Sequence, residues 1–171
     1  MMFSQLLKFT ALLAIATLVN AECTLENVIT EEEKGVKETR PEVCQTQGEG
    51  DWTFTMMNSM VGVPTFNGGN AFAGVTGNDA FLIFDEDCMP HGVYSPGNNG
   101  ECGIPYEVQE GFLRWTMIIE SVNMFMGGGD FSFAYGAGTY TIGENHCACQ
   151  DISEGLRAEQ ACGCSFPVNG E

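Results

Sequence analysis

Residues 122–142 read VNMFMGGGDFSFAYGAGTYTI, and this stretch decides the expected fold. Beyond the glycine triplet at 127–129 the chain alternates aromatic with small residues, with Phe131, Phe133 and Tyr135 on one side and Ser132, Ala134 and Gly136 on the other. A period of two is the pattern of a half-buried β-strand. The small residues opposite the aromatic ones would let another backbone or a ligand come close. We therefore expect a β-hairpin with the glycine triplet in its turn, and the sequence leaves open which face points inward.

Other segments carry strand patterns of the same kind. Trp52, Phe54 and Met56 alternate with threonine and methionine, and residues 80–84 form a short apolar run between polar residues. Residues 106–126 fit both a strand and a helix, because apolar side chains recur at both spacings. Their β-branched residues and the bounding Gly111 and Gly127 favour a strand. The sequence thus predicts an all-β domain, and a helix over 106–126 is the alternative that would break this interpretation.

Changes in composition divide the chain into four regions. We predict a signal peptide at 1–21, an acidic N-terminal arm at 22–50, an antiparallel β-domain at 51–145 and a Cys-rich tail at 146–171. Within the arm, Glu31–Glu33 followed by Lys34 and Lys37 indicates a short exposed helix that ends near Pro41. The loop 88–102 is rich in glycine, proline and asparagine, so we expect no regular element in it. Ser153 is expected to cap two helical turns that extend to Gln160.

The first residues and the charge restrict the location and the partners. Lys8, an apolar run at 9–19 and the small Ala21 have the layout of a secretory signal peptide, so we expect a secreted, extracellular protein. A retained membrane anchor is the alternative, although the run is short for a bilayer. With 23 Asp and Glu against 6 Lys and Arg, the net charge is −17. This charge argues against nucleic acid or an anionic membrane as partner, since phosphate binding needs basic residues.

All eight cysteines follow the predicted cleavage site and are expected to form four disulfides in an oxidising compartment: Cys23, Cys44, Cys88, Cys102, Cys147, Cys149, Cys162 and Cys164. A Cys23–Cys44 bridge would clip the arm, and a Cys88–Cys102 bridge would close the loop between them. Cysteines two residues apart on a strand point the same way. Facing Cys-x-Cys strands would therefore form two rungs, for example Cys147–Cys164 and Cys149–Cys162.

No motif for catalysis, a metal or a cofactor is secure. The two Cys-x-Cys units beside His146 have a shorter spacing than zinc sites, and secreted thiols oxidise, so we expect no metal there. The acidic run 85–87 lacks the spacing of a calcium loop. His91 and His146 have no neighbours that mark a catalytic triad, and a surface position is expected for both. The glycine triplet is followed by a strand rather than the helix of a phosphate loop.

A family resemblance comes from the stretch quoted first. Residues 126–136, MGGGDFSFAYG, resemble the glycine-rich signature of dirigent proteins and allene oxide cyclases, which share one barrel. The resemblance implies an eight-stranded antiparallel closed β-barrel over 51–145 with an internal apolar pocket. Small barrels can hold one small ligand. Dirigent proteins are secreted and steer the coupling of phenoxy radicals, whereas allene oxide cyclases close a fatty-acid epoxide into a cyclopentenone. The four disulfides and the tail after Ile142 depart from both families.

The expected function follows from the barrel. We expect a secreted protein that binds or steers a small apolar molecule without catalysing its reaction, with Trp115, Phe131, Phe133 and Tyr135 as ligand-binding residues. The first alternative is a small cysteine-rich interaction or effector protein whose partner is another extracellular protein. The second alternative is an isomerase or cyclase of the allene oxide cyclase kind. No cofactor and no metal are expected, and the sequence identifies no catalytic residue.

Overall fold

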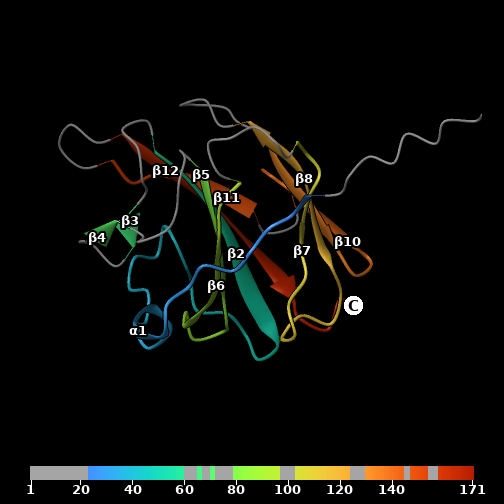
Figure 1. The fold of residues 1–171 in the computed structure, drawn as a ribbon, viewed down its shortest axis with the longest axis horizontal. Coiled ribbons are helices and arrows are strands. Elements are labelled where there is room, and N and C mark those ends of the chain that lie inside the picture. Colours follow the sequence, from blue (N-terminus) through green and yellow to red (C-terminus); the bar gives the residue numbers. More distant parts are fainter. Residues whose placement is uncertain are drawn as a thin grey trace, which may run out of the picture.

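The chain folds into two five-stranded β-sheets that face each other (Figure 1). The computed structural model describes residues 23–59, 65–66, 70–71, 79–96, 103–123, 130–144, 147–153 and 158–171. Sheet A contains, in spatial order, β1 (Cys23–Thr24), β7 (Tyr106–Val108), β8 (Met117–Asn123), β9 (Asp130–Tyr135) and β10 (Gly138–Thr141). Sheet B contains β11 (Cys147–Asp151), β12 (Glu159–Pro167), β2 (Asp51–Ser59), β5 (Asp79–Phe84) and β6 (Pro90–Tyr94). A separate hairpin joins β3 (Thr65–Phe66) to β4 (Asn70–Ala71).

The all-β prediction is confirmed, and the aromatic side of the opening stretch faces inward. In β9, Phe131, Phe133 and Tyr135 are buried, while the residues between them are only partly buried. Strand rather than helix is also confirmed for the described part of 106–126, where β7 and β8 form an antiparallel pair. These strands are shorter than expected, because a turn occupies much of 109–116. All ladders except the short parallel pair of β1 with β7 are antiparallel.

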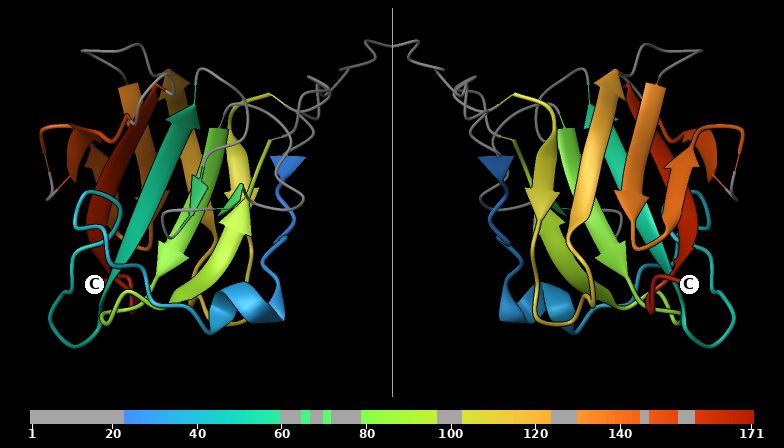
Figure 2. Two further views of the ribbon diagram at one scale, coloured as in Figure 1. Left: turned by 90° about the vertical axis from the view of Figure 1, so that its left-hand side faces the viewer. Right: turned by 90° about the vertical axis from the view of Figure 1, so that its right-hand side faces the viewer.

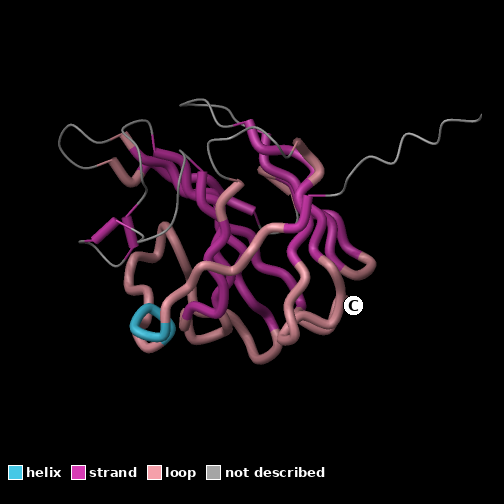
Figure 3. The backbone as a smooth tube through the Cα atoms, viewed as in Figure 1, coloured by secondary structure: helices cyan, strands magenta, loops and turns pink. Residues whose placement is uncertain are grey.

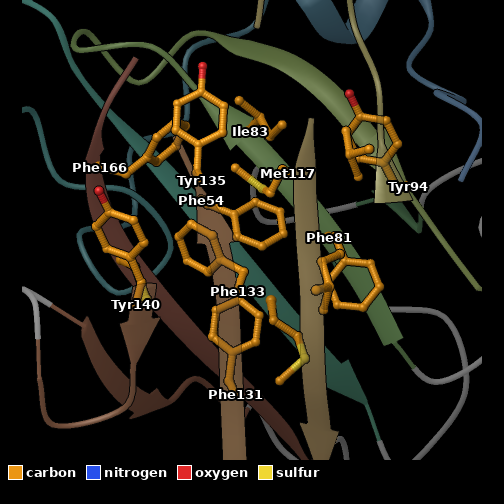
Figure 4. Packing of buried hydrophobic residues seen from close by; sticks show 14 of the residues in the cluster. Phe54, Phe81, Ile83, Tyr94, Met117, Phe131, Phe133, Tyr135, Tyr140 and Phe166 are labelled. Carbon is orange, nitrogen blue, oxygen red and sulfur yellow. The ribbon is translucent and has the colours of Figure 1, made fainter. Parts of the chain in front are cut away.

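Aromatic side chains from both sheets fill the space between them (Figure 4). Phe54 of sheet B meets Phe133 of sheet A edge to face, with ring centroids 4.8 Å apart. Phe166 of β12 packs in the same way on Tyr135, at 5.0 Å. Phe54 and Phe133 have no exposed surface, and Phe166 has none either. Side chains of this size dominate core energetics, so this layer is the main source of stability.

Within the described residues no closed barrel is found, which corrects the predicted architecture. The strands separate into two sheets, whereas a closed barrel would continue one ladder around the whole wall. At one side of the sandwich the extended first part of the arm, residues 25–30, crosses from sheet A to sheet B, and we call it the N-terminal segment. Leu25 N donates to Glu107 O of β7 and Val28 N to Val93 O of β6, each at 2.8 Å. This segment joins the two open edges without forming a continuous ladder.

The opposite side is closed by the C-terminal turn. Ala137 N, in the β9–β10 turn, donates to Gly170 O at 3.1 Å. Gly136 and Gly170 both have positive φ, 56° and 77°, and a Cβ at Gly136 would overlap the backbone of Gly170. Glycine is required at such a close approach. The two sheets are therefore tied at both sides by short backbone contacts rather than by a shared sheet.

The N-terminal arm packs on the outer face of sheet B. It contains α1 (Glu31–Lys34), the only helix in the described part of the chain (Figures 2 and 3). The predicted short helix is thus confirmed, although it ends at Lys34 rather than near Pro41. Thr30 caps it, and Glu33 completes a capping box. Val43 and Cys44 are buried against Met57, Leu82 and other residues of the outer face. This arm gives sheet B a second apolar core, whereas the outer face of sheet A leaves Ile118 exposed.

The disulfides confirm one of the expected sets and correct the other. Cys147–Cys164 and Cys149–Cys162 form the two predicted rungs between β11 and β12. Cys44 pairs with Cys88, so the predicted Cys23–Cys44 and Cys88–Cys102 bridges are wrong. Cys44 lies in the arm and Cys88 in the β5–β6 turn, which the arm crosses. No free cysteine occurs among the described residues, and Cys23 is also disulfide-bonded; Cys102 lies outside that part of the chain.

One prediction about the loops is wrong, and other predictions fall outside the described residues. The loop 88–102, expected to be irregular, contains the edge strand β6. Gly92 in this strand has a packing role, because a Cβ there would overlap the ring of Tyr94. The Cys-rich tail contributes strands to the sandwich, since β12 lies between β11 and β2 in sheet B. The predicted signal peptide, the glycine triplet, His146 and residues 154–157 of the predicted second helix lie outside the described residues. The end of that helix is wrong, because Glu159 and Gln160 belong to β12.

Removing the disulfide that holds the arm should destabilise the fold. Cys44–Cys88 spans 44 residues, so on the chain-entropy account its loss lowers the free energy of unfolding by up to about 4 kcal/mol. We expect this loss for the Cys44→Ser/Cys88→Ser variant in urea denaturation. The Cys149→Ser/Cys162→Ser variant is the control, and it should lose less because Cys147–Cys164 still joins the same two strands. An equal or smaller loss for the first variant would contradict the clamping of the arm.

Asp79 should make the stability depend on pH in a defined direction. Burial raises the pKa of Asp79, and the hydrogen bond that its Oδ1 accepts from Asn58 Nδ2 offsets this only in part. The folded state therefore holds this proton at pH values where the unfolded chain has lost it. Relative to Asp79→Asn, the wild type should gain stability as the pH falls from neutral to about 4. Parallel denaturation series check this, and a wild type that loses stability relative to the variant on acidification would refute it.

Candidate functional site

The four residues predicted to bind a ligand do not surround a common cavity. Phe131, Phe133 and Tyr135 lie in the packed core, each with at most 1% of its surface exposed. Trp115 is on the outside with 51% exposed, and its indole Nε1 donates to Asn169 O at 3.3 Å. Tyr135 has a role in the fold, since its hydroxyl donates to Val168 O at 2.6 Å and accepts from Arg114 N. Ligand binding by these four residues stays a prediction.

A cleft of about 420 Å³ lies where the N-terminal segment, β6 and the β7–β8 turn meet. We call it the Phe112 cleft, and it is lined by Asn27, Lys34, Met89, Pro90, His91, Glu110 and Phe112. Its volume is within the range of small-molecule sites. Its lining combines the apolar Met89, Pro90 and Phe112 with four polar or charged residues that converge from different segments. This cleft is the candidate functional site.

Hydrogen bonds to backbone atoms hold the walls of the Phe112 cleft in place. The Asn27 side chain donates to His91 O at 3.2 Å and accepts from Val93 N at 3.1 Å, which fixes the N-terminal segment along β6. Leu113 N donates to Glu110 O, so a turn presents Glu110 and Phe112 together. The Leu113 side chain is buried in the core and anchors this turn. The cleft is therefore built on backbone that is tied at several points.

Two hydrogen-bonded pairs set the electrostatics of the cleft. His91 Nε2 lies 3.1 Å from Asp85 Oδ2, and the His91 side chain is 36% exposed. On the other side, the Tyr94 hydroxyl donates to Glu110 Oε1 at 3.1 Å. Burial and then the charge of Glu110 raise the pKa of Tyr94 well above its ordinary value. Tyr94 therefore stays a donor at physiological pH, and Glu110 accepts from it through Oε1, while no partner of its other oxygen is seen among the described residues.

The aromatic rings of Trp52 and Phe112 pack against the imidazole of His91. The rings of Trp52 and His91 are 4.7 Å apart, and Phe112 lies 5.5 Å from His91 and 5.8 Å from Trp52. All three rings are partly exposed. Such contacts orient an imidazole, and the His91 and Phe112 rings line the cleft. Chemically, the site offers aromatic and thioether surface together with a carboxylate, an imidazole and the ammonium group of Lys34.

The sequence did not reveal this site, because its residues come from four separate segments. His91 was expected at the surface and Phe112 in a strand, and nothing in their local pattern connects them. The Asp85–His91 spacing has no motif meaning by itself. Within the described residues, no group of three or more His, Cys, Asp or Glu side chains is placed to hold a metal ion. In the same part of the chain, no helix has the length and hydropathy needed to cross a membrane.

Comparisons with known proteins do not assign the site. No protein-family model, curated protein or solved structure matches this chain. The resemblance of residues 126–136 to dirigent proteins and allene oxide cyclases stays a prediction.

Tyr135→Phe should test the structural role of a residue that was predicted to bind a ligand. Its loss of the hydroxyl leaves Val168 O and Arg114 N without this partner, which costs about 1–3 kcal/mol. We expect a lower midpoint in urea denaturation. Tyr140→Phe is the matched control, because no hydrogen bond of the Tyr140 hydroxyl to the described chain is seen and its removal should change stability by less than about 0.5 kcal/mol. Equal effects of the two substitutions would contradict the assignment.

Proposed function

We propose that the protein is secreted and binds a small molecule with an apolar body and a polar group in the Phe112 cleft. The observation that carries this proposal is the cleft itself, of about 420 Å³, where Phe112 and Met89 lie beside Glu110 and His91. Sites for small molecules combine apolar walls with a few oriented polar groups in this way. The binding role expected from the sequence is retained, but its place changes from the interior to the outer surface.

The filled interior supports a surface site. The space between the sheets is occupied by large side chains such as Phe54, Phe81 and Phe133, which have no exposed surface. A ligand could enter there only by displacing side chains that pack at the density of organic crystals. The Phe112 cleft needs no such displacement. Its rim is held by the hydrogen bonds of the Asn27 side chain to His91 O and of Leu113 N to Glu110 O. Ligand binding would therefore cost little conformational entropy of the chain.

The polar groups define the ligand further. Glu110 and His91 favour a ligand with hydrogen-bond donors, such as a phenol, an alcohol or an amine. Lys34 lies at the rim, where it pairs with Glu31 at 2.6 Å, and could approach an acidic group of the ligand. The disulfides support the extracellular location, because such bonds persist in oxidising compartments. The predicted signal peptide completes the argument for secretion.

A panel of phenolic, fatty-acyl and amine compounds tests this function by thermal shift and calorimetry. We expect at least one class to stabilise the protein, and Glu110→Gln, which keeps an oxygen for Tyr94, to weaken its binding about tenfold or more, equal to about 1.4 kcal/mol. Phe112→Ala should do the same by removing the apolar wall.

Trp115→Ala is the control for these variants, because Trp115 is an exposed aromatic residue outside the cleft. It should leave the affinity unchanged. No stabilisation by any compound, or a ligand whose binding depends on Trp115 and not on Phe112, would overturn the proposal.

A further inference from the structure

A second hollow runs along the outer face of sheet B, between the arm and β11. Two adjoining depressions of about 60 and about 750 Å³ share Gln45, Gln47, Ala148 and Ser165, so they form one open groove. We call it the glutamine groove. Gln45 and Gln47 of the arm form one wall and Gln150 of β11 belongs to the other. None of these residues lines the Phe112 cleft, so the groove is a separate feature.

The walls of the glutamine groove are fixed. The Thr55 hydroxyl donates to Val43 O at 2.6 Å, deep in the protein, and Val43 itself is buried. The adjacent Cys44 is bound to Cys88, which fastens the arm a second time. Gly163 in the floor keeps the arm close, because a Cβ there would approach Thr55 Oγ1 to 3.3 Å. The opposite wall, β11, is held to β12 by the two disulfide rungs. The groove is thus formed before any ligand binds.

The groove presents polar groups that are mostly uncharged. No hydrogen bond of the Gln45, Gln47 or Gln150 side-chain amides to the described chain is seen, and each amide offers both a donor and an acceptor. At the wide end, the Tyr140 ring lies over Gly138, where a Cβ would come within 2.7 Å of its hydroxyl. Burial, with a smaller contribution from the nearby Asp51, raises the pKa of Tyr140 and keeps the hydroxyl protonated.

The groove also has apolar surface and lacks positive charge. Ala148, Pro167 and Cys147 with its disulfide give an apolar strip beside the polar groups. Among the described residues that line the groove there is no Lys or Arg, while Glu42, Asp51 and Glu171 contribute carboxylates. Anionic ligands, including sulfated or uronate sugars, would be repelled here and by the net charge of −17.

We propose that the glutamine groove binds a neutral oligosaccharide chain. Neighbouring hydroxyl groups of a sugar match the paired donor and acceptor of a side-chain amide, and they donate to carboxylates such as Asp51. The C–H faces of sugar rings suit the apolar strip, and an open groove admits a chain longer than one ring. A basic peptide would need carboxylates along its whole path, whereas amides form much of these walls. The groove would attach the secreted protein to an extracellular polysaccharide.

The test uses the full mature chain with insoluble cellulose, chitin, β-1,3-glucan and xylan, followed by calorimetry with the hexasaccharide of whichever polymer retains it. We expect retention by at least one neutral polymer, with an affinity unchanged between low and about 0.5 M salt. Gln45→Ala/Gln150→Ala should weaken hexasaccharide binding about tenfold or more. Gln109→Ala removes an exposed amide just beyond β7, far in the chain from the groove residues, and should leave the binding unchanged. Circular dichroism confirms that both variants fold.

Three results would overturn this proposal. They are retention by none of the neutral polymers, equal binding by the Gln45→Ala/Gln150→Ala and Gln109→Ala variants, and preferential binding of hexalysine that declines with salt. The last would mark the groove as a site for basic peptides. Phe112→Ala separates the two sites, since it should leave saccharide binding intact whether or not a small molecule binds in the Phe112 cleft.

Discussion

The contact between the aromatic layers of the two sheets is the interaction on which the rest of the structure depends. Phe54 meets Phe133 at 4.8 Å and Phe166 meets Tyr135 at 5.0 Å, each edge to face. These rings bury the apolar faces of both sheets at once, and among the described residues they fill the space between the sheets. The ligand sites that we propose consequently lie on the outside. There the N-terminal arm and segment, rather than the sheets alone, shape both the Phe112 cleft and the glutamine groove.

The two outer faces of the sandwich differ because only one of them is covered. Sheet B is apolar on both sides, and the arm covers its outer side with Val43 and Cys44. Sheet A is apolar on one side only, and residues such as Ile118 and Glu120 on its other side are exposed. The arm therefore stabilises sheet B and forms one wall of the glutamine groove through the same few contacts. Its disulfide to Cys88 holds the groove wall and the strand that leads to His91 in one arrangement.

Much of the fold could be predicted from periodicity, and closure could not. The alternation in β9 and β2 identified the strands, and the two Cys-x-Cys units identified the rungs, because both depend on local spacing. Whether strands close into a barrel depends on which edges meet. Which edges meet is decided by two contacts between residues far apart in the chain. Val28 N donates to Val93 O of β6, and Ala137 N of the β9–β10 turn donates to Gly170 O. The Cys44–Cys88 pair was missed for the same reason, since the composition of the arm does not predict the path that the arm takes across sheet B.

The candidate site was beyond prediction for a related reason. Phe112, His91 and Asn27 carry no motif, and they meet only because the N-terminal segment crosses from sheet A to sheet B. The residues that looked most suited to a ligand, Phe131 and Phe133, are the ones that the core requires. Aromatic alternation indicates a buried face, and it does not distinguish a pocket lining from a packed interior.

Xenon binding followed by NMR tests the central claim most directly, because this gas enters apolar cavities that are closed to water. If the aromatic side chains fill the space between the sheets, raising the xenon pressure should leave the signals of Phe54, Phe133 and Met117 in place. Saturable shifts confined to these residues would show a hollow interior and would contradict the account.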